Sequence, residues 1–303
     1  MKALPFIDEK GLNETLGMHE AIDALERAFA GQLPTAPERI HLDTGTGDLL
    51  LMPAWGEGSM GVKLVTVAPG NNALGKPLIQ GIYVLFDRQS LTPVALFDGA
   101  ALTALRTAAL SGVATKYLAR PDATELVIFG AGTQARAHLE AIAAVRDVKT
   151  VRVVSRSPER ASELGALAAE RFDADVAHPE AVATADVICT CTTSSTPVFD
   201  GHLLPPGVHI NAVGSYKPSA RELDDAAIGS VRIVVDTPVA LIESGDLRTP
   251  LESGVIKEED IEELATVVAQ GRHRKSPDDR TLFKSVGSAF EDLVVAEAAA
   301  RHL

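Results

Sequence analysis

Three small residues at a fixed spacing give this sequence its clearest chemical signal. Gly130, Gly132 and Ala135 form the pattern G-x-G-x-x-A between an apolar run at 126–129 and a helix-forming stretch. In such a strand–turn–helix unit the first glycine permits a sharp turn, the second lets a pyrophosphate approach the backbone, and the third small residue lets the helix lie close to the strand. The helix N-terminus also favours anions. The pattern predicts a dinucleotide site at Gly130, Ala131, Gly132, Thr133, Gln134 and Ala135.

The residues after the next predicted strand bear on which dinucleotide binds. A strand at 150–154 ends at Ser155, where an NAD-specific site usually carries an acidic residue for the ribose hydroxyls. Arg156 and Ser157 follow directly, and Arg160 stands one turn further on. Because arginine binds phosphate through a planar fork, these four residues favour NADPH, with NADH as the alternative. A solvated loop would explain the arginines but not the missing carboxylate.

Three cations stand among apolar neighbours. Arg39 and Lys63 lie in strand-like segments, and Arg106 lies in an alanine-rich helix with Leu102 and Leu110 four residues away on either side. A charge on an apolar element needs a counter-ion, because burying an unpaired charge is strongly unfavourable. A bound carboxylate would supply one. The alternative for each cation alone is a surface side chain whose stem covers apolar groups.

The elements that must position the glycine turn begin at about residue 119. Apolar and β-branched runs predict strands at 125–129, 150–154, 186–191, 208–213 and 231–235, separated by helices or turns. This alternation predicts a Rossmann-type α/β domain, a doubly wound parallel sheet, over residues 119–288. We expect a helix at 256–270 and a last strand or turn at 284–287. Ligands bind at the carboxyl ends of such strands, which adds four residues to the predicted cofactor site: Thr192, Val213, Gly214 and Ser215.

Residues 1–118 have a different pattern. An amphipathic helix is predicted at 18–30, and turns separate strand-like segments at 39–43, 48–53, 60–67, 80–87 and 93–97. A helix at 101–119 leads into the second domain. The sequence therefore predicts an N-terminal, mostly antiparallel β domain. A final alanine-rich helix from Ala289 to His302 is expected to pack back on it, so that 289–303 completes the first domain.

Composition excludes several classes of protein. The 303 residues carry 28 basic and 41 acidic side chains, a net charge of −13, which opposes general binding to nucleic acid or an anionic membrane. The sequence has no signal-peptide pattern and no apolar run long enough to span a membrane, so we expect a cytoplasmic protein. Cys189 and Cys191 are too close along one strand for an unstrained disulfide, and the histidines show no metal-binding spacing. We expect no metal.

Several blocks in this order resemble the ornithine cyclodeaminase and mu-crystallin family. They are Leu51-Met52-Pro53, the T-x-x-R-T-A-A block from Thr103 to Ala109, the glycine turn, Asn211 to Gly214, and Phe283 to Gly287 followed by Glu291-Asp292. The resemblance implies hydride transfer between a nicotinamide cofactor and a small α-imino or α-amino acid, in an obligate homodimer formed through the first domain. It also implies that Lys63 and Arg106 are catalytic, that Thr107 contacts the cofactor phosphates, and that five residues bind substrate: Arg39, Lys63, Arg106, Val286 and Gly287.

Two departures from the family pattern bear on the reaction. In the cyclodeaminases an aspartate follows the N-A-V-G block by two positions and a glutamate precedes L-M-P, whereas this chain has Tyr216 and Leu50 there. The distal ammonium of ornithine would lose an anionic partner, at a cost of about 2–5 kcal/mol. We therefore favour NADPH-dependent reduction of a cyclic imino acid, Δ1-pyrroline-2-carboxylate or Δ1-piperideine-2-carboxylate. Ornithine cyclodeamination with bound NAD, and non-catalytic binding of a small molecule in the manner of mu-crystallin, remain as alternatives.

Overall fold

The computed structural model describes residues 3–271 and 274–302, except the side chain of Asn72. The chain divides into two compact units: Met1–Ala109 with Ser288–Leu303, and Leu110–Gly287. The division falls within helix α3 (Gly99–Leu118). Of the predicted domains, residues 1, 2 and 303 of the first and residues 272–273 of the second lie outside the described residues. No described helix is long and apolar enough to cross a membrane, and the described His, Cys, Asp and Glu side chains form no group suited to a metal ion.

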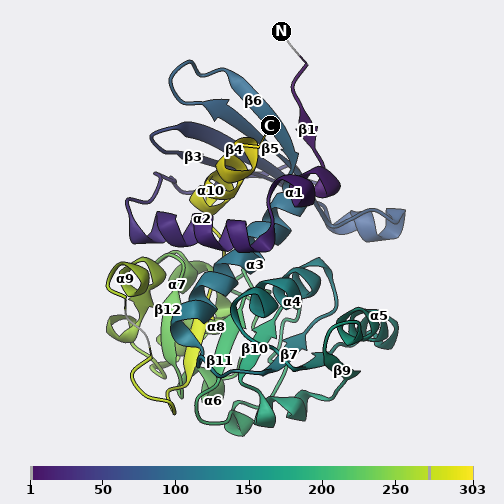
Figure 1. Ribbon diagram of the computed structural model, residues 1–303, viewed down its shortest axis with the longest axis vertical. Helices are drawn as coiled ribbons and strands as arrows, with labels where there is room; N and C mark the ends of the chain where they lie inside the picture. Colours follow the sequence, from purple (N-terminus) through teal and green to yellow (C-terminus); the bar gives the residue numbers. More distant parts are fainter. Residues whose placement is uncertain (1–2, 272–273, 303) are drawn as a thin grey trace. The chain divides into compact units, whose positions relative to one another are not determined.

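The first unit is built on a six-stranded sheet with the order β1-β6-β5-β4-β3-β2 (Figure 1). Its neighbours pair antiparallel except β1 and β6, which are parallel. The strands are β1 (Phe6–Ile7), β2 (Ile40–Asp43), β3 (Asp48–Trp55), β4 (Ser59–Val67), β5 (Ile79–Asp87) and β6 (Pro93–Asp98). The mostly antiparallel domain predicted from the alternating segments is thus confirmed. The sequence missed β1 because two residues carry no periodicity.

Helices cover one face of this sheet. Helix α10 (Ala289–Ala300) packs against β3 and β4 and contacts α2 (Met18–Ala30), with Phe29 and Phe290 in an edge-on ring contact at 5.5 Å. The predictions for both helices are confirmed, although α10 ends two residues before His302. The short helices α1 (Glu9–Thr15) and η1 (Pro69–Leu74) were not predicted.

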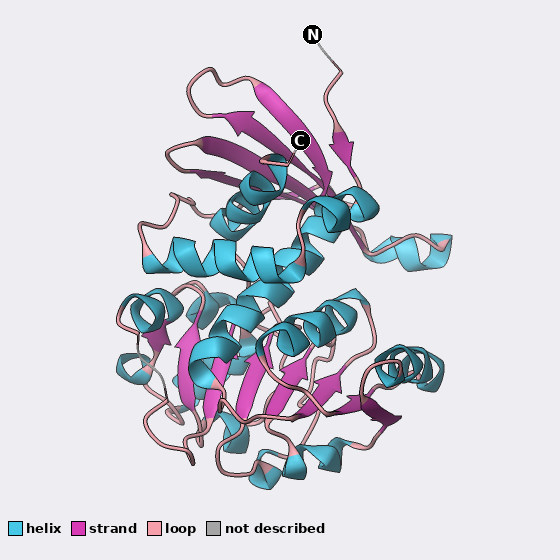
Figure 2. Ribbon diagram, viewed as in Figure 1, coloured by secondary structure: helices cyan, strands magenta, loops and turns pink. Residues whose placement is uncertain are grey.

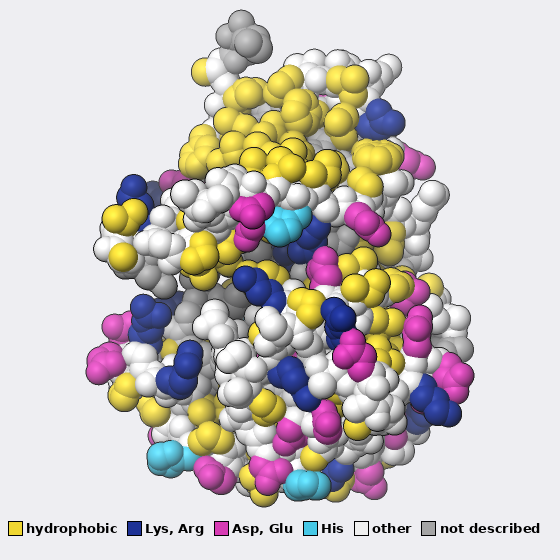
Figure 3. All heavy atoms as spheres, turned by 180° about the vertical axis from the view of Figure 1, so that it is seen from behind, with side chains coloured by type: hydrophobic (Ala, Val, Ile, Leu, Met, Phe, Trp, Pro, Cys, Tyr) yellow, Lys and Arg dark blue, Asp and Glu magenta, His cyan; other side chains and the backbone are white. Residues whose placement is uncertain are grey.

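The opposite face of the sheet is apolar and exposed. Ile40, Leu42, Ile82 and Val94 are 37–50% exposed, and Ile82 lies directly across from Leu64 in the β4–β5 register. Figure 3 shows hydrophobic side chains gathered over this part of the chain. Since a sheet with one covered face usually turns polar residues to water on the other, this face is unusual for a monomer.

The second unit is an eight-stranded parallel sheet with the order β13-β12-β14-β11-β10-β7-β8-β9 (Figure 2). The strands are β7 (Glu125–Phe129), β8 (Thr150–Val154), β9 (Asp173–Val176), β10 (Val187–Thr190), β11 (His209–Ala212), β12 (Arg232–Val235), β13 (Glu262–Glu263) and β14 (Thr281–Lys284). After β9 the chain returns to the other side of β7, so the strand order reverses between β7 and β10. Ligands of doubly wound sheets bind at such a switch point.

Helices lie on both faces of this sheet and bury two apolar clusters. One cluster joins β7, β8 and β10 to α4 (Thr133–Val145) and α5 (Pro158–Ala169). The other joins β11 and β12 to short helical segments that precede or follow these strands in the chain. Those segments are η2 (Pro179–Thr184), η3 (Gly201–Leu203), α6 (Asp225–Ile228), α7 (Ala240–Glu243) and α8 (Gly245–Ser253). The predicted Rossmann-type architecture is confirmed.

The helix predicted at 256–270 is wrong over its first half. Glu258–Asp260 forms the 3-10 turn η4, Glu262–Glu263 forms β13, and only Leu264–Ala269 is the helix α9. Ile261 is the single apolar residue from Glu258 to Glu263, which is too few for the apolar stripe of a helix, and a continuous apolar face begins at Leu264. The last strand in the chain, β14, ends at Lys284, the first residue of the segment expected as a strand or turn, and it pairs between β11 and β12.

Candidate functional site

The glycine turn has the geometry that a dinucleotide site needs. Gly130 has a φ of +105°, and a Cβ there would lie 2.5 Å from the carbonyl oxygen of Cys191, so this position requires glycine. Gly132 is the N-cap of α4, and a Cβ there would meet no protein atom within 4 Å. The first N–H groups of α4 therefore adjoin open space at the switch point. A phosphate group fits this cradle of backbone and helix terminus.

The predicted cofactor residues gather at one edge of the sheet. Because all eight strands are parallel, the residues that follow them share the carboxyl edge, and the register aligns Phe129 with Val154 and Thr190. The Gly130 N–H donates to the Val154 carbonyl at 2.8 Å, which ties the glycine turn to the end of β8. At this edge lie Gly130, Ser155, Thr192, Val213, Gly214 and Ser215.

A buried glutamate that the sequence did not single out organises this edge. The side chain of Glu222 is inaccessible to solvent and accepts hydrogen bonds from the Thr192 N–H (2.7 Å), the Thr192 hydroxyl (2.7 Å), the Gly214 N–H (2.9 Å) and the Ser215 N–H (3.1 Å). It also accepts from the Thr190 hydroxyl at 2.9 Å. One carboxylate thus holds the loops after β10 and β11.

A buried ion pair between Lys284 and Asp246 lies beside Glu222. The Lys284 ammonium lies 2.9 Å from Asp246, whose other oxygen accepts from the Glu222 N–H at 2.7 Å. Lys284 also donates to the Ser215 carbonyl at 2.6 Å. Burial raises the pKa of the Glu222 carboxyl, and the positive charge of Lys284 opposes that rise.

The segment predicted to select the cofactor is half-buried at Ser155 and exposed at Arg156 and Arg160. The Ser155 hydroxyl accepts from the Ser157 N–H at 3.3 Å, and the Ser157 hydroxyl caps α5 by accepting from the Arg160 N–H at 3.4 Å. Within the described residues, neither guanidinium pairs with a carboxylate, so both are available to an anion. Glu159, whose carboxylate accepts from the Ser157 hydroxyl, is a nearby negative charge that opposes this role.

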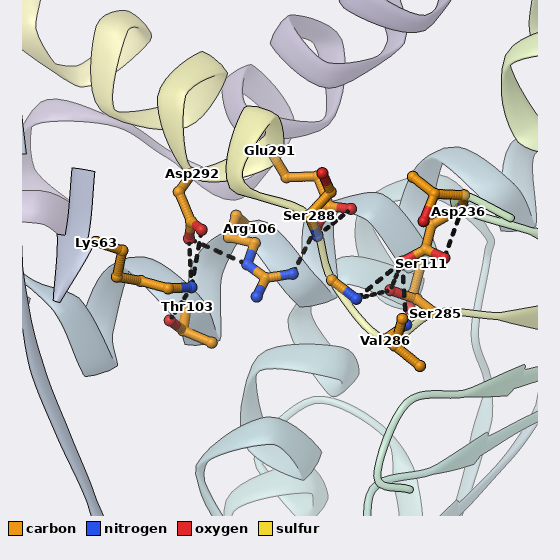
Figure 4. Close-up of polar contacts among 12 residues, drawn as sticks. Lys63, Thr103, Arg106, Ser111, Asp236, Ser285, Val286, Ser288, Glu291 and Asp292 are labelled. Atoms are coloured by element: carbon orange, nitrogen blue, oxygen red, sulfur yellow. Dashed lines mark hydrogen bonds and ion pairs between the residues drawn. The ribbon is translucent and has the colours of Figure 1, made fainter. Parts of the chain in front are cut away.

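The loop that contains Val286 and Gly287 is held by Asp236, which directly follows β12. Its buried carboxylate accepts from the Ser285 hydroxyl at 2.7 Å, the Val286 N–H at 3.0 Å and the Gly287 N–H at 2.8 Å (Figure 4). Burial raises the pKa of the Asp236 carboxyl, and these hydrogen bonds partly offset the rise. Gly287 has a φ of +78°, a conformation that favours glycine.

Within the first unit, Lys63 and Arg106 meet on one carboxylate (Figure 4). Asp292 accepts from the Lys63 ammonium at 3.0 Å through Oδ1 and lies 2.8 Å from it through Oδ2, and Oδ1 also accepts from the Arg106 Nε at 3.2 Å. Glu291 accepts from Arg106 at 2.5 Å, and Thr103 accepts from Lys63 at 3.2 Å. The side chains of both acids are inaccessible to solvent, and those of both cations are at most 6% exposed.

This cluster corrects one inference from the sequence. Arg106 was expected to lack a protein counter-ion because no acid stands one turn away in its own helix. The counter-ions instead come from α10, nearly two hundred residues later in the chain. Arg106, Lys63, Glu291 and Asp292 together carry no formal net charge before any ligand binds.

The pKa of Lys63 is lowered to about 8. Burial is the largest cause, since it penalises the charged ammonium, and the charge of Arg106 acts in the same direction. Asp292 opposes both through its charge and its hydrogen bond, and Glu291 adds a smaller opposing effect. A lysine with such a pKa can give up and regain a proton near neutral pH.

The remaining predicted residues occupy separate positions. Arg39 is half-buried immediately before β2. It is not one of the residues in the ion pairs that link Lys63 and Arg106 through Asp292. Thr107 is buried in α3, one residue after Arg106. Leu50 stands on β3 two residues from Met52, which lies directly across from Lys63. Tyr216 is half-buried, and the Lys217 ammonium lies 5.7 Å from its ring. Neither Leu50 nor Tyr216 can supply a carboxylate.

Known proteins of similar sequence and fold include structures that hold a nicotinamide cofactor. A Δ1-pyrroline-2-carboxylate reductase of Bacillus cereus is 43% identical over 258 residues, 82% of this chain and 79% of that protein. The structure of the Thermococcus litoralis Δ1-pyrroline-2-carboxylate reductase in complex with NADH and L-proline superposes with a TM-score of 0.92 at 35% identity, over 99% of this chain and 97% of that one. An archaeal alanine dehydrogenase dimer with bound NAD has a TM-score of 0.93 at 31% identity, over 99% and 95% of the two chains.

The family model of the ornithine cyclodeaminases and mu-crystallins matches residues 8–301, almost the whole chain. The match extends over both units, and it includes the glycine turn and the Lys63–Arg106 cluster. The chain therefore belongs to the ornithine cyclodeaminase/mu-crystallin family, within its NAD(P)H-dependent oxidoreductases.

Proposed function

We propose that this protein reduces a small cyclic imino acid, Δ1-pyrroline-2-carboxylate or Δ1-piperideine-2-carboxylate, to proline or pipecolate with NADPH. The observation that carries the proposal is the buried pair of Lys63 and Arg106, joined by Asp292. A cation with a fixed fork suits a carboxylate, and an ammonium with a lowered pKa suits proton delivery to nitrogen. The Bacillus cereus relative that is 43% identical is named as a Δ1-pyrroline-2-carboxylate reductase.

Each residue then has a defined task. Arg106 binds the substrate carboxylate, and Arg39 assists it. Val286 and Gly287 contact the substrate. Lys63 gives a proton to the imine nitrogen, and the chemistry that a nicotinamide cofactor would supply when bound is the hydride for the imine carbon. The C=N bond gains one proton and one hydride and becomes a CH–NH bond. Holding the two reactants in a fixed orientation is the larger part of the catalysis.

The cofactor would be held by the carboxyl edge of the second unit. The glycine turn and the N-terminus of α4 would bind the pyrophosphate, and Thr107 would also contact the phosphates. The loops after β10 and β11 would contact the rest of the cofactor. For the 2′-phosphate we propose Ser155, Arg156, Ser157 and Arg160, since both guanidinium groups are exposed and Ser155, not an acidic residue, directly follows β8. The relatives whose complexes contain NADH and NAD make NADH the competing cofactor.

We also propose a homodimer in which the apolar outer face of the first unit meets that of a second copy. The exposed side chains of β2, β5 and β6 support this, because water would otherwise contact a continuous apolar surface. The archaeal alanine dehydrogenase of the same family is a dimer.

The test incubates the purified protein with each imino acid and either NADPH or NADH, and separately with ornithine and NAD. The proposal predicts cofactor oxidation with an imino acid, faster with NADPH. Ammonia release from ornithine without net cofactor turnover would identify a cyclodeaminase despite Leu50 and Tyr216. Tight binding of NADPH with no turnover of any substrate would identify a binding protein.

A further inference from the structure

Asp292 occupies a position that its motif alone does not explain. Its two oxygens contact the Lys63 ammonium at 3.0 and 2.8 Å, and one of them also accepts from the Arg106 Nε at 3.2 Å. Asp292 therefore bridges Lys63, the proposed proton donor, and Arg106, the residue proposed to bind the substrate carboxylate. We infer that Asp292 is a positioning residue for the reduction, which keeps Lys63 protonated and aims one of its N–H groups at the imine nitrogen. This inference rests on the proposed function.

The count of donors on Lys63 supports this role. An ammonium has three N–H groups. Asp292 and Thr103 accept from Lys63, and among the described residues no third acceptor contacts it. Two fixed partners on a side chain that is 3% exposed restrict the direction of the remaining N–H group. That group is the one available to a substrate.

The charges around Lys63 explain why the carboxylate is needed. Helix α3 brings Arg106, whose positive charge repels the ammonium, and α10 brings Asp292 and Glu291, which attract it. From β5, Tyr83 lies directly across from Lys63, and its pKa is raised by burial and by Asp292, so that the phenol stays neutral. Met52 on β3 carries no charge. Asp292 is thus the main group that holds a proton on Lys63.

The step itself balances without a further reactant. The Lys63 N–H bond breaks and its proton forms the new N–H bond of the product. The reduced cofactor, when bound, would lose a hydride from a C–H bond to the imine carbon and be left oxidised. Lys63 is left as a neutral amine and regains its proton from water. Because the donor must be protonated, activity should fall as the pH rises through the pKa of Lys63, which is about 8.

The test compares Asp292→Asn with Glu291→Gln and Glu297→Gln, which all lie on α10. Asp292→Asn removes the main counter-ion, so the pKa of Lys63 falls and the alkaline limb of the kcat profile moves to lower pH by roughly one to three units. Glu291→Gln should mainly raise KM, because Glu291 pairs with Arg106. Glu297, which accepts from Ser59 and pairs with Arg301, serves as the matched control and should leave the limb unchanged.

Titration of isotope-labelled lysine by NMR, assigned with Lys63→Arg, measures the same pKa without turnover. A lower kcat in Asp292→Asn with an unmoved limb and an unmoved Lys63 titration would overturn the inference. If Asp292→Asn does not fold, Lys63→Arg decides: retained kcat with the same alkaline limb would mean that the proton comes from elsewhere. Should the unmodified protein reduce no imino acid, the proposed function itself fails, whatever the titration shows.

Discussion

Arg106 is held by its protein partners in a way that suits the carboxylate ligand we propose for it. Its guanidinium is buried, its Nε faces Asp292 and another nitrogen faces Glu291, so its plane is fixed before substrate arrives. A guanidinium fixed in this way loses little conformational freedom when it binds a planar carboxylate.

We predict that Arg106→Lys keeps the charge but loses the fork. Hydrogen bonds to charged groups contribute about 1.5–3 kcal/mol, so kcat/KM should fall roughly 10- to 100-fold, mainly through KM. Steady-state kinetics with the imino acid measures this. Arg27→Lys, at an exposed position on α2, is the control, and an unchanged KM in Arg106→Lys would remove Arg106 from substrate binding.

The proposed preference for NADPH depends on side chains that follow β8. We predict that Ser155→Asp combined with Arg156→Ala moves the ratio of kcat/KM for NADPH over NADH toward NADH by roughly 10- to 100-fold, since a carboxylate repels the 2′-phosphate and accepts from ribose hydroxyls. Arg171→Ala, an exposed arginine of the same unit, should leave the ratio unchanged. Equal ratios in the double variant and the parent would contradict the role of this segment.

At the scale of elements, the two glycines of the turn between β7 and α4 differ in role: we expect one to matter for stability and the other for cofactor binding. Gly130 has a positive φ, and a Cβ there would clash with the Cys191 carbonyl oxygen, whereas a Cβ at Gly132 would meet no protein atom within 4 Å. We predict that Gly130→Ala lowers the free energy of unfolding by about 1–3 kcal/mol or more. Gly132→Ala should change it by less than about 1 kcal/mol but weaken dinucleotide binding, because the added methyl group occupies the phosphate cradle.

Denaturant unfolding and cofactor titration of the two glycine variants give both quantities. A Gly132→Ala protein that binds NADPH as tightly as the parent would show that the pyrophosphate does not lie against this turn.

The sequence predicted those parts of the fold and site that local pattern controls. Strands β7 and β8 and helix α2 have the predicted limits, since their periodicity is strong and turn residues bound them. Glu222 and Asp236 were missed because their partners come from loops that only the folded sheet brings together. Asp292 was noted within a motif, but its contact with Lys63 depends on α10 packing against β4.

At the scale of the whole molecule, we predict a dimer because the first unit has an exposed apolar face. Ile82→Glu combined with Leu64→Glu places two charges at adjacent positions of that face, and we predict that the protein then sediments as a monomer while the parent sediments as a dimer. Leu167→Glu, which alters an exposed leucine of α5, is the control. A parent protein that is monomeric at micromolar concentration would contradict the proposed interface.

The most direct test of the central claim is the stoichiometry of the reaction with Δ1-pyrroline-2-carboxylate. Loss of the near-ultraviolet absorbance of NADPH is followed while proline is quantified in the same sample. The buried Lys63–Asp292–Arg106 cluster, together with Leu50 and Tyr216, predicts one NADPH oxidised for each proline formed, and no ammonia from ornithine. Proline and ammonia formed from ornithine with no net change in cofactor, and no oxidation with the imino acid, would contradict it.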